Sequence, residues 1–408
     1  MESFSKSIIL NLNIDNGGTY MKGYKALNMD MSSKYGSMAY KIGKKYTIAG
    51  ELIMCENGFH FCKCLEDVEN YYTIAKSRIF EVEADGKIIN KWRKSCASCA
   101  ESITLIRELS EEEIHQYFAD NQKRILRKFW YCRKALADQG LCLDKLIYDK
   151  DPDVRKAVAR QKYRLDVLVN DKSSWVRTAV ARQGYGLDIL VNDEKSDVRI
   201  AVAKQGYGLD ILIKDEDPDV RTAVAKRGYN LETLIHDKDP WVRVAVAKQG
   251  YGLDILVNDE NYCVRAAVAK QGYGLSILVN DENSDVRKEI AAQGYGLDIL
   301  IKDTESSVRA AVARQGYDLE TLIHDKDPWV RVAVAEQGYG LETLINDENW
   351  RVRKEVAAQG YGFNVLIEDE DSVVRATVAK QGYGLDILIH DKNLLVRNAA
   401  LNKLEALQ

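Results

Sequence analysis

The sequence predicts a small α+β domain followed by an all-α solenoid of 22-residue repeats, each with one α-helix and one very short α- or 3₁₀-helix. Three observations lead to this fold class. Val-Arg recurs twelve times at a constant spacing between Val154 and Val396. An Asp stands six residues before every one of these arginines. The residues that precede the repeats lack this period and alternate strand-like runs with turn signals. A fixed period is typical of proteins in which each unit buries its apolar face against its neighbours.

Composition limits the classes of function. Hydrophobic residues make up 46% of the 408 residues and charged residues 29%, as in packed proteins. The formal net charge is −4, divided as +2 over residues 1–130 and −6 over the remainder. Because a nucleic-acid binder usually carries a strong basic excess, we expect no nucleic-acid partner. No apolar run is long enough to cross a bilayer, so we expect no membrane contact and a cytoplasmic location.

The chain divides into four predicted segments. Residues 1–21 form a polar leader, 22–118 a small α+β domain, 119–131 a connecting helix, and 132–408 a solenoid of about 12–13 repeats. Gly17 and Gly18 shortly precede Met21, and Gly-Gly codons can spell a ribosome-binding site. One hypothesis is therefore that Met21 is the native start and that the leader is not native. The alternative is an ordinary disordered N-terminus.

The elements of the first domain follow from alternation and turn signals. Asp85-Gly86 predicts a turn, and Ser110 with Glu113 forms a capping box at the start of the last helix. The predicted strands are Lys22–Leu27, Lys45–Ile48, Glu51–Cys55, Arg78–Ala84 and Ile103–Leu109, and the predicted helices are Leu65–Ala75 and Ser110–Phe118.

Four short motifs in this domain resemble a small uncharacterised domain found in phage and prophage proteins. They are Gly23-Tyr-Lys-Ala26, Gly58-Phe-His-Phe-Cys62, Phe80-Glu-Val-Glu83 and Ile103–Leu109. The resemblance covers about one hundred residues. It implies a phage or prophage origin and carries no established activity.

A second motif bears on catalysis. Glu81 and Glu83 match the Glu-x-Glu that the ADP-ribosyltransferase fold can carry on a late strand. The Arg-Gly of that family is replaced here by Tyr24 or Lys25, and its Ser-Thr-Ser by Phe59-His60-Phe61. Alternation alone also places both glutamates on the solvated face of a strand. We therefore expect no enzyme; the alternative is an ADP-ribosyltransferase-like enzyme in residues 22–118 whose target the solenoid recruits.

The cysteines raise the question of a metal. Cys62 and Cys64 form one pair, and Cys96 and Cys99 form a second pair with the spacing of a zinc ligand loop. The first pair is one residue short, and the two pairs lie far apart in the chain. Free thiols in a reducing compartment are the favoured interpretation, with no cofactor, and a zinc site at these four cysteines is the alternative.

Each repeat contains clear helix start and stop signals. All four prolines of the chain fall at one repeat position, each directly after an Asp. Asp at the N-cap and Pro at the first helical position are the expected helix start. The helix then ends at a glycine column that includes Gly250, and a second column at Gly252 precedes a very short helix around Leu253–Val257.

The motif Asp-Pro-x-Val-Arg followed by Ala-Val-Ala resembles the variant leucine-rich repeat, and more loosely HEAT-like repeats. Pro240–Ala247 shows the helical part of it, Pro-Trp-Val-Arg-Val-Ala-Val-Ala. The resemblance covers roughly residues 125–400. It implies one α-helix and one 3₁₀-helix per unit, and it is specific for architecture rather than for a partner.

The constant Asp and Arg columns have two interpretations. The arginines form either an exposed binding stripe or an internal ladder, bonded to Asp side chains and to helix-end carbonyls. An interior guanidinium needs a partner, and the column always lies beside a core Val, so the ladder is favoured.

Function is then expected in the variable columns. The chain is predicted to be a protein-binding scaffold or adaptor, in its sharpest form a phage protein acting on a host protein; a nucleic-acid-binding HEAT-like solenoid is an alternative. Leu234–Ala247 and Leu322–Ala335 are identical, which predicts two similar binding patches. The predicted partner-binding residues are Trp175, Trp241, Trp329, Trp350, His236 and His324. A basic rail, which a solvated face also explains, comprises Arg160, Arg182, Lys204, Lys226, Lys248 and Lys270.

Overall fold

The computed structural model describes residues 20–33, 39–48, 50–53, 58–90 and 97–407. Residues 1–19 of the predicted leader and Cys96 lie outside these residues, whereas Tyr20 and Met21 begin the first strand. The chain forms two compact units, Met1–Tyr207 and Gly208–Gln408. The first unit contains a β-sheet and the first repeats, and the second contains only repeats.

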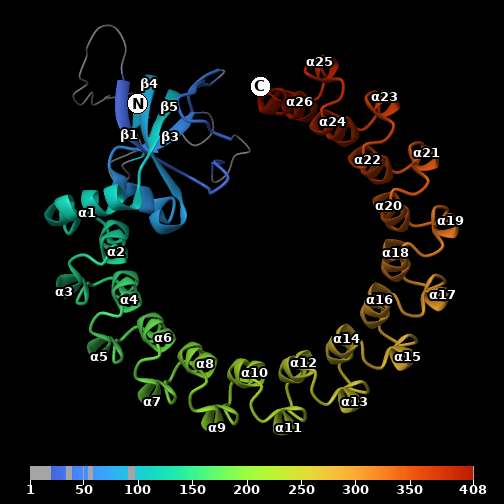
Figure 1. Ribbon diagram of the computed structural model, residues 1–408, viewed down its shortest axis with the longest axis horizontal. Coiled ribbons are helices and arrows are strands. Elements are labelled where there is room, and N and C mark those ends of the chain that lie inside the picture. The colour runs from blue at the N-terminus through green and yellow to red at the C-terminus, as the bar shows by residue number, and fades with distance from the viewer. Residues whose placement is uncertain (1–19, 34–38, 49, 54–57, 91–96, 408) are drawn as a thin grey trace, which may run out of the picture. The chain divides into compact units, whose positions relative to one another are not determined.

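The sheet of the first unit is antiparallel throughout, in the order β2-β5-β3-β1-β4. Because β4 also pairs with β5, the strands β5, β3, β1 and β4 close on themselves (Figure 1). The strands are β1 (Tyr20–Leu27), β2 (Lys45–Thr47), β3 (Phe59–Cys62), β4 (Arg78–Asn90) and β5 (Ala97–Glu108).

Alternation along the strands separates two faces. Phe80, Val82 and Ala84 of β4 are buried in a core, together with residues of β3 and β5. Tyr40 and Tyr46 pack against each other in this core, with ring centroids 5.0 Å apart. The core therefore occupies one face of the sheet, as period-2 burial requires.

Some predictions in this domain were wrong. The single helix predicted over Leu65–Ala75 is two 3₁₀-helices, η1 (Leu65–Asn70) and η2 (Ile74–Lys76). The residues between them, Tyr71, Tyr72 and Thr73, have weak helix propensity.

Two strand predictions also need correction. The turn predicted at Asp85-Gly86 is a register shift inside β4, which absorbs the positive φ of Gly86. The described part of the strand predicted at Glu51–Cys55, residues 51–53, belongs to none of the five strands, whereas β3 had been noted only as a motif.

The predicted α-solenoid is confirmed, with one long and one four-residue helix in a typical unit. In the first unit the helices are α1 (Glu111–Ile125), α2 (Trp130–Asp138), α3 (Leu143–Leu146), α4 (Pro152–Arg160), α5 (Leu165–Leu168), α6 (Ser174–Arg182), α7 (Leu187–Leu190) and α8 (Ser196–Gln205). The capping box at Ser110 is present at the start of α1.

The second unit continues the pattern. Its long helices are α10 (Pro218–Lys226), α12 (Pro240–Lys248), α14 (Tyr262–Lys270), α16 (Ser284–Ala292), α18 (Ser306–Arg314), α20 (Pro328–Glu336), α22 (Trp350–Ala358), α24 (Ser372–Gln381) and α26 (Leu394–Leu407). Its short helices are α9 (Leu209–Leu212), α11 (Leu231–Leu234), α13 (Leu253–Leu256), α15 (Leu275–Leu278), α17 (Leu297–Leu300), α19 (Leu319–Leu322), α21 (Leu341–Leu344), α23 (Phe363–Leu366) and α25 (Leu385–Leu388). Figure 1 shows the long helices of this unit along one edge and the short helices along the other.

Local signals place each helix boundary. Asp239 caps α12 by accepting a hydrogen bond of 2.8 Å from the amide of Trp241, and Pro240 occupies the first helical position. Gly250 ends the helix with φ of +73°, and Gly252 precedes α13 with φ of +59°. A Cβ at Gly252 would collide with Cδ1 of Ile235, so this turn needs glycine for close packing as well as for its φ.

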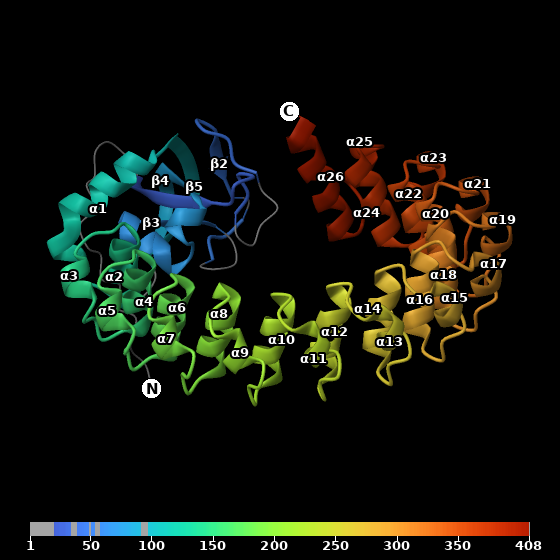
Figure 2. The same cartoon turned by 60° about the horizontal axis from the view of Figure 1, so that its bottom comes forward.

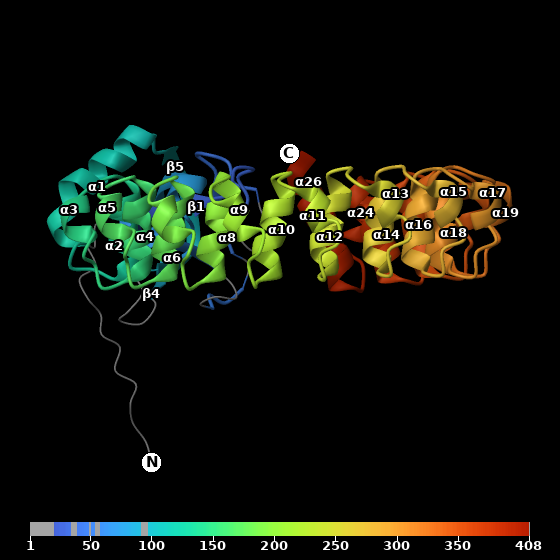
Figure 3. The same cartoon turned by 90° about the horizontal axis from the view of Figure 1, so that it is seen from below.

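Neighbouring long helices pack through small and branched side chains. Val242, Val246 and Ala247 of α12 are fully buried, and Leu256 of α13 completes the same core. Successive long helices such as α12 and α14 are in direct contact, and Figure 3 shows neighbouring units of residues 208–408 side by side. Each 22-residue repeat therefore completes its hydrophobic core only with the next repeat.

The predicted Arg–Asp ladder is confirmed, and each arginine binds the carboxylate of the following 22-residue repeat. Arg243 donates from Nε and Nη2 to the two carboxylate oxygens of Asp259, over 2.6 and 2.8 Å. Its Nη1 donates over 2.7 Å to the backbone carbonyl of Asp237, in its own unit. The amide of Asn261 also donates to Asp259, over 2.9 Å. The same three Arg bonds recur at Arg133 (with the Lys128 carbonyl), Arg155, Arg177, Arg221, Arg265, Arg287, Arg309, Arg331, Arg353 and Arg375.

The ladder lowers the pKa of its carboxyl groups. Burial tends to raise the pKa of Asp281, but hydrogen bonds from Arg265 and from the Asn283 amide outweigh burial, so the pKa lies below the ordinary value. At Asp391 the hydrogen bonds from Arg375 are the largest influence, and they lower the pKa. These carboxylates are therefore held in the charged form by folding.

Arg243→Ala is expected to destabilise the second unit by about 3 kcal/mol, because it leaves the buried Asp259 carboxylate without its cation. The side chain of Arg243 is only 9% exposed, so water cannot replace the lost bonds. Urea unfolding followed by circular dichroism measures the change. A similar substitution at the exposed Lys238 serves as the control, and equal stability of the two variants would contradict a structural ladder.

Acid should weaken the repeats in a defined range. A carboxylate with a lowered folded-state pKa stabilises the fold above its unfolded pKa of about 3.9, and this contribution is lost as the pH falls through the folded value. We expect the urea midpoint to fall as the pH decreases below about 4, the unfolded pKa of these carboxyl groups. Asp281→Asn should lower the midpoint at neutral pH and flatten its pH dependence; an unchanged slope would show that this carboxylate does not contribute.

Candidate protein-binding surface

The ladder removes the constant arginines from the list of binding residues. Most of their side chains are buried between neighbouring repeats, for example at 6% exposure for Arg221 and 9% for Arg243, and the others are partly buried. What remains accessible on the long helices is the set of variable positions, together with the last residue of each helix. The search for a binding surface therefore turns to these positions.

Three tryptophans near the starts of long helices project into solvent. The exposed fractions are 56% for Trp175, 60% for Trp241 and 56% for Trp329. The backbone amides of Trp241 and Trp329 donate to the capping residues Asp239 and Asp327, which fixes the main chain beneath each ring. Side chains that expose more than half of their surface do not fill gaps between units.

Trp350 lies one position earlier in its helix and is partly buried. The guanidinium of Arg351 lies 4.5 Å from the centre of the Trp350 ring and 5.5 Å from that of Trp329. Arg351 therefore joins two tryptophans of neighbouring units into one exposed aromatic and cationic group, a type of contact worth roughly 0.5–1 kcal/mol at a surface.

The two identical stretches of sequence have the same structure. His236 and His324 are both exposed, each in the connection between a short helix and the next long helix. Trp241 and Trp329 follow at the same distance, at the starts of α12 and α20. Both helices belong to the second unit, where Figure 2 shows them in one row of long helices. The second unit thus presents the same His and Trp pair twice, although Arg351 contacts Trp329 and the corresponding residue near Trp241 is Cys263.

The residues of the predicted basic rail are all exposed and all lie at the ends of long helices. A cation in the last turn is favourable with the helix dipole, so each has a local structural reason. Lys270 also pairs with Glu289 at 3.4 Å, and at the same repeat position Arg314 pairs with Glu336 at 2.8 Å. In the second unit the rail is therefore interrupted by carboxylates.

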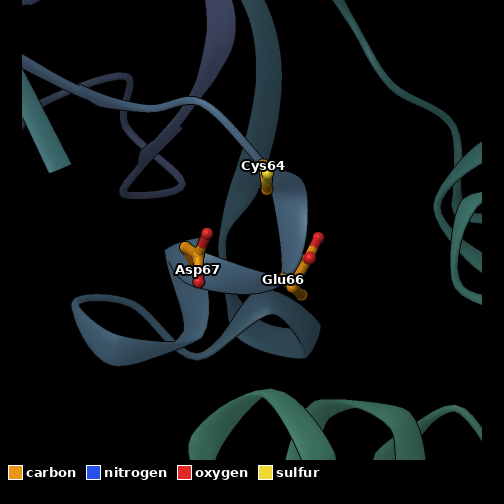
Figure 4. Close-up of side chains that lie close together, drawn as sticks. All are labelled: Cys64, Glu66 and Asp67. Carbon is orange, nitrogen blue, oxygen red and sulfur yellow. The ribbon is translucent and has the colours of Figure 1, made fainter. Parts of the chain in front are cut away.

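The cysteine region contains a buried ionic cluster (Figure 4). Cys64, Glu66 and Asp67 bring ligand-type atoms within 4.8 Å of one another. Arg124 and Lys128 already lie 2.6 and 2.8 Å from Oε1 of Glu66, and Lys128 lies 3.1 Å from Asp67. Two cations thus neutralise these carboxylates, and the donor set does not fit a further metal ion. Cys62 and Cys99, of the predicted zinc set, are buried in β3 and β5.

The candidate catalytic residues occupy two faces of the sheet. Lys25 pairs in register with Phe80 on the core side, where its Nζ donates over 2.8 Å to the carbonyl of His60. Burial lowers the pKa of Lys25 to about 8. Glu81 lies on the opposite face and forms two bonds of 3.0 Å with Arg107. Lys25 and Glu81 therefore do not form one site.

Sequence reasoning missed an exposed aromatic and aliphatic column. The repeated tyrosines are not buried between repeats: Tyr251 is 42% exposed, and Ile255 four residues later is 51% exposed. The sequence signal is the repeated motif Tyr-Gly-Leu-Asp-Ile-Leu. Its second Leu is the buried residue of the short helix, and the Ile directly before that Leu therefore points to another side of the helix.

The sheet domain matches a known family model. Residues 21–117 match a domain of unknown function, DUF7666. The DUF7666 segment contains the five strands and the first part of α1. No curated protein matches the chain. Within the described residues, no helix combines the length and the apolar character that crossing a bilayer requires.

Solved structures with repeated helices align with the chain at low similarity. An engineered protein has 17% identity over 72% of this chain and 95% of its own, with a TM-score of 0.23. Kap121p bound to Nup53p has 13% identity over 72% of this chain and 41% of its own, with a TM-score of 0.22. A microtubule polymerase with TOG domain arrays has 13% identity over 67% and 78%, with a TM-score of 0.18. The assignment of the solenoid therefore rests on the repeated helices of this chain itself.

The Glu66–Lys128 pair joins the DUF7666 segment to the first repeat, so Lys128→Ala should destabilise the first unit by about 3 kcal/mol. Lys172 occupies the same repeat position two units later and is exposed, which makes Lys172→Ala the matched control. Thermal melting compares the two variants. Equal melting temperatures would show that the buried cluster does not hold this junction.

Proposed function

We propose that this chain is a non-enzymatic scaffold or adaptor that binds another protein through its variable repeat positions. The observation that supports the proposal is the exposure of Trp175, Trp241 and Trp329 on rigid helix starts. Tryptophan is enriched among residues that dominate protein interfaces, because one ring buries a large area at little entropic cost.

The duplicated patch supports a partner with two equivalent contacts. Trp241 and Trp329 stand in identical stretches four repeats apart, with His236 and His324 beside them in sequence. A partner that touches both patches gains affinity because the second contact forms at a high effective concentration. Trp175 and Trp350 are proposed as further contacts.

A sharper form of the proposal is a phage or prophage protein that acts on a host protein. Its support is the resemblance of Gly58-Phe-His-Phe-Cys62 and its companion motifs to domains of phage and prophage proteins. In this form, the repeats recognise the host protein and the sheet domain occupies the start of the array.

Replacing both Trp241 and Trp329 by Ala should reduce recovery of the partner at least about tenfold, since one interface tryptophan is commonly worth 2 kcal/mol or more. The tagged full-length chain is used as bait in a lysate of its native host, and the recovered proteins are quantified by mass spectrometry. Each single variant should have an intermediate effect if both patches are used.

The matched control replaces Ile255 and Ile299 by Ala. These side chains are exposed to about the same extent, 51% and 49%, but lie on short helices. Equal recovery by the wild type and the tryptophan double variant would contradict the anchor assignment. A loss equal to that of the isoleucine variant would place the contact elsewhere.

A further inference from the structure

Two surface hollows occupy the same repeat position. One, of about 360 Å³, is lined by Tyr262, Arg265 and Glu282 and their neighbours. The other, of about 450 Å³, is lined at corresponding positions by Trp130, Arg133 and Lys150. The offset from Trp130 to Tyr262 is six repeats. Both hollows therefore form between the starts of successive long helices, at places where the first helical residue is a large aromatic.

The hollow beside Trp130 has its own chemistry, because the variable positions around it are basic. Lys150 replaces the glutamate found at Glu282. Arg127 occupies the position that is Asp in the twelve later repeats, where no preceding repeat supplies an arginine for a carboxylate to bind. The segment from Lys123 to Lys134 holds six cations and no acidic residue.

Most charges around the hollow are already paired. Lys128 contacts Glu66 and Asp67, and Arg133 is held by Asp149. Arg127 and Lys150 are exposed, and among the described residues neither has a carboxylate within ion-pair distance. Two cations thus remain available to a ligand on the rim of one hollow.

The aromatic wall is held rigidly. Phe129 is 46% exposed and Trp130 is 41% exposed. Tyr131, which is buried, stacks on Phe129 at 5.7 Å and meets Trp130 edge-on at 6.0 Å. The two exposed rings therefore need little reordering when a ligand packs on them, which favours binding.

We propose that this hollow binds an acidic segment of a partner protein, in which an aromatic or large aliphatic side chain stands beside carboxylates. The apolar side chain packs on Phe129 and Trp130, and the carboxylates pair with Arg127 and Lys150. This inference rests on the proposed function, protein binding, and adds a second contact site with a stated preference.

A peptide fits the site better than a nucleic acid does. Only two cations are available, whereas nucleic-acid sites follow the backbone with many. The repeats that continue from the hollow carry a net negative charge, which offers no extended basic track.

The test uses a fluorescein-labelled random copolymer of glutamate and tyrosine, with labelled polyglutamate and an oligothymidylate as comparison probes. Fluorescence anisotropy measures binding to the full-length chain. The wild type should bind the copolymer at least about tenfold more tightly than polyglutamate, which is about 1.4 kcal/mol, because only the copolymer offers an aromatic anchor. Arg127→Glu with Lys150→Glu should weaken copolymer binding at least tenfold, and Trp130→Ala should abolish the preference over polyglutamate.

The matched control is Lys172→Glu with Lys326→Glu, because both lysines occupy the repeat position of Lys150, whereas the repeat position of Trp130 is Pro152 or Ser306 in their repeats. Thermal melting confirms that each variant is folded. An equal loss in the control variant, or tighter binding of oligothymidylate through Arg127 and Lys150, would overturn the proposal, as would the absence of copolymer binding.

The outcome is independent of the tryptophan patches. Copolymer binding should be unchanged by Trp241→Ala with Trp329→Ala, since those residues belong to other repeats. Failure of the pull-down together with intact copolymer binding would remove the tryptophan anchors and leave this site. The reverse result would remove this site alone.

Discussion

The structure of the repeats depends on one interaction, the pair of hydrogen bonds that each buried arginine donates to the aspartate of the next repeat. A guanidinium that loses water must recover its hydrogen bonds, and here a carboxylate and a backbone carbonyl supply them. The same carboxylate accepts the amide that starts the next long helix, as Asp259 does from Asn261. One aspartate therefore connects two neighbouring repeats and accepts a hydrogen bond from the turn between them. A one-dimensional stack of small units gains its cohesion from such nearest-neighbour terms.

The ends of the ladder show how this constraint is met without a neighbour. At the start, Arg133 bonds the carbonyl of Lys128, and Arg127 stands where an aspartate would otherwise be. There η1 of the sheet domain packs against α2 and brings Glu66 and Asp67 to Lys128. At the other end, α26 is longer than the other long helices of its unit and packs against α24. The sheet domain thus covers the first repeat much as a capping unit does.

The ladder also decides where recognition occurs. Because Asp, Arg, Gly and Leu are committed to packing and turns, the large variable side chains that could bind a partner lie mainly at the starts and ends of the long helices. The starts carry Trp175, Trp241 and Trp329 and, one position earlier, Trp130, Tyr262 and Trp350. Trp130 and Tyr262, each the first residue of its helix, line the two surface hollows. The surface offers discrete aromatic sites rather than a continuous charged track.

The sequence by itself determined the period, the helix boundaries within the repeats and the burial of the arginines, but not the connection before them, where the helix predicted over 119–131 is divided between α1 and α2. These depend on local rules: Asp and Pro begin a helix, glycine in a left-handed conformation ends it, and a constant charge beside core Val needs a partner. It also gave β1, β4 and the capping box at Ser110, because alternation and capping act over a few residues. Tertiary structure decided which unit supplies the carboxylate to Arg243 and that Lys25 and Glu81 face opposite sides of the sheet. It also brought Arg127 and Lys150 to one hollow. These features join residues distant in sequence, and only packing in three dimensions fixes which of them meet.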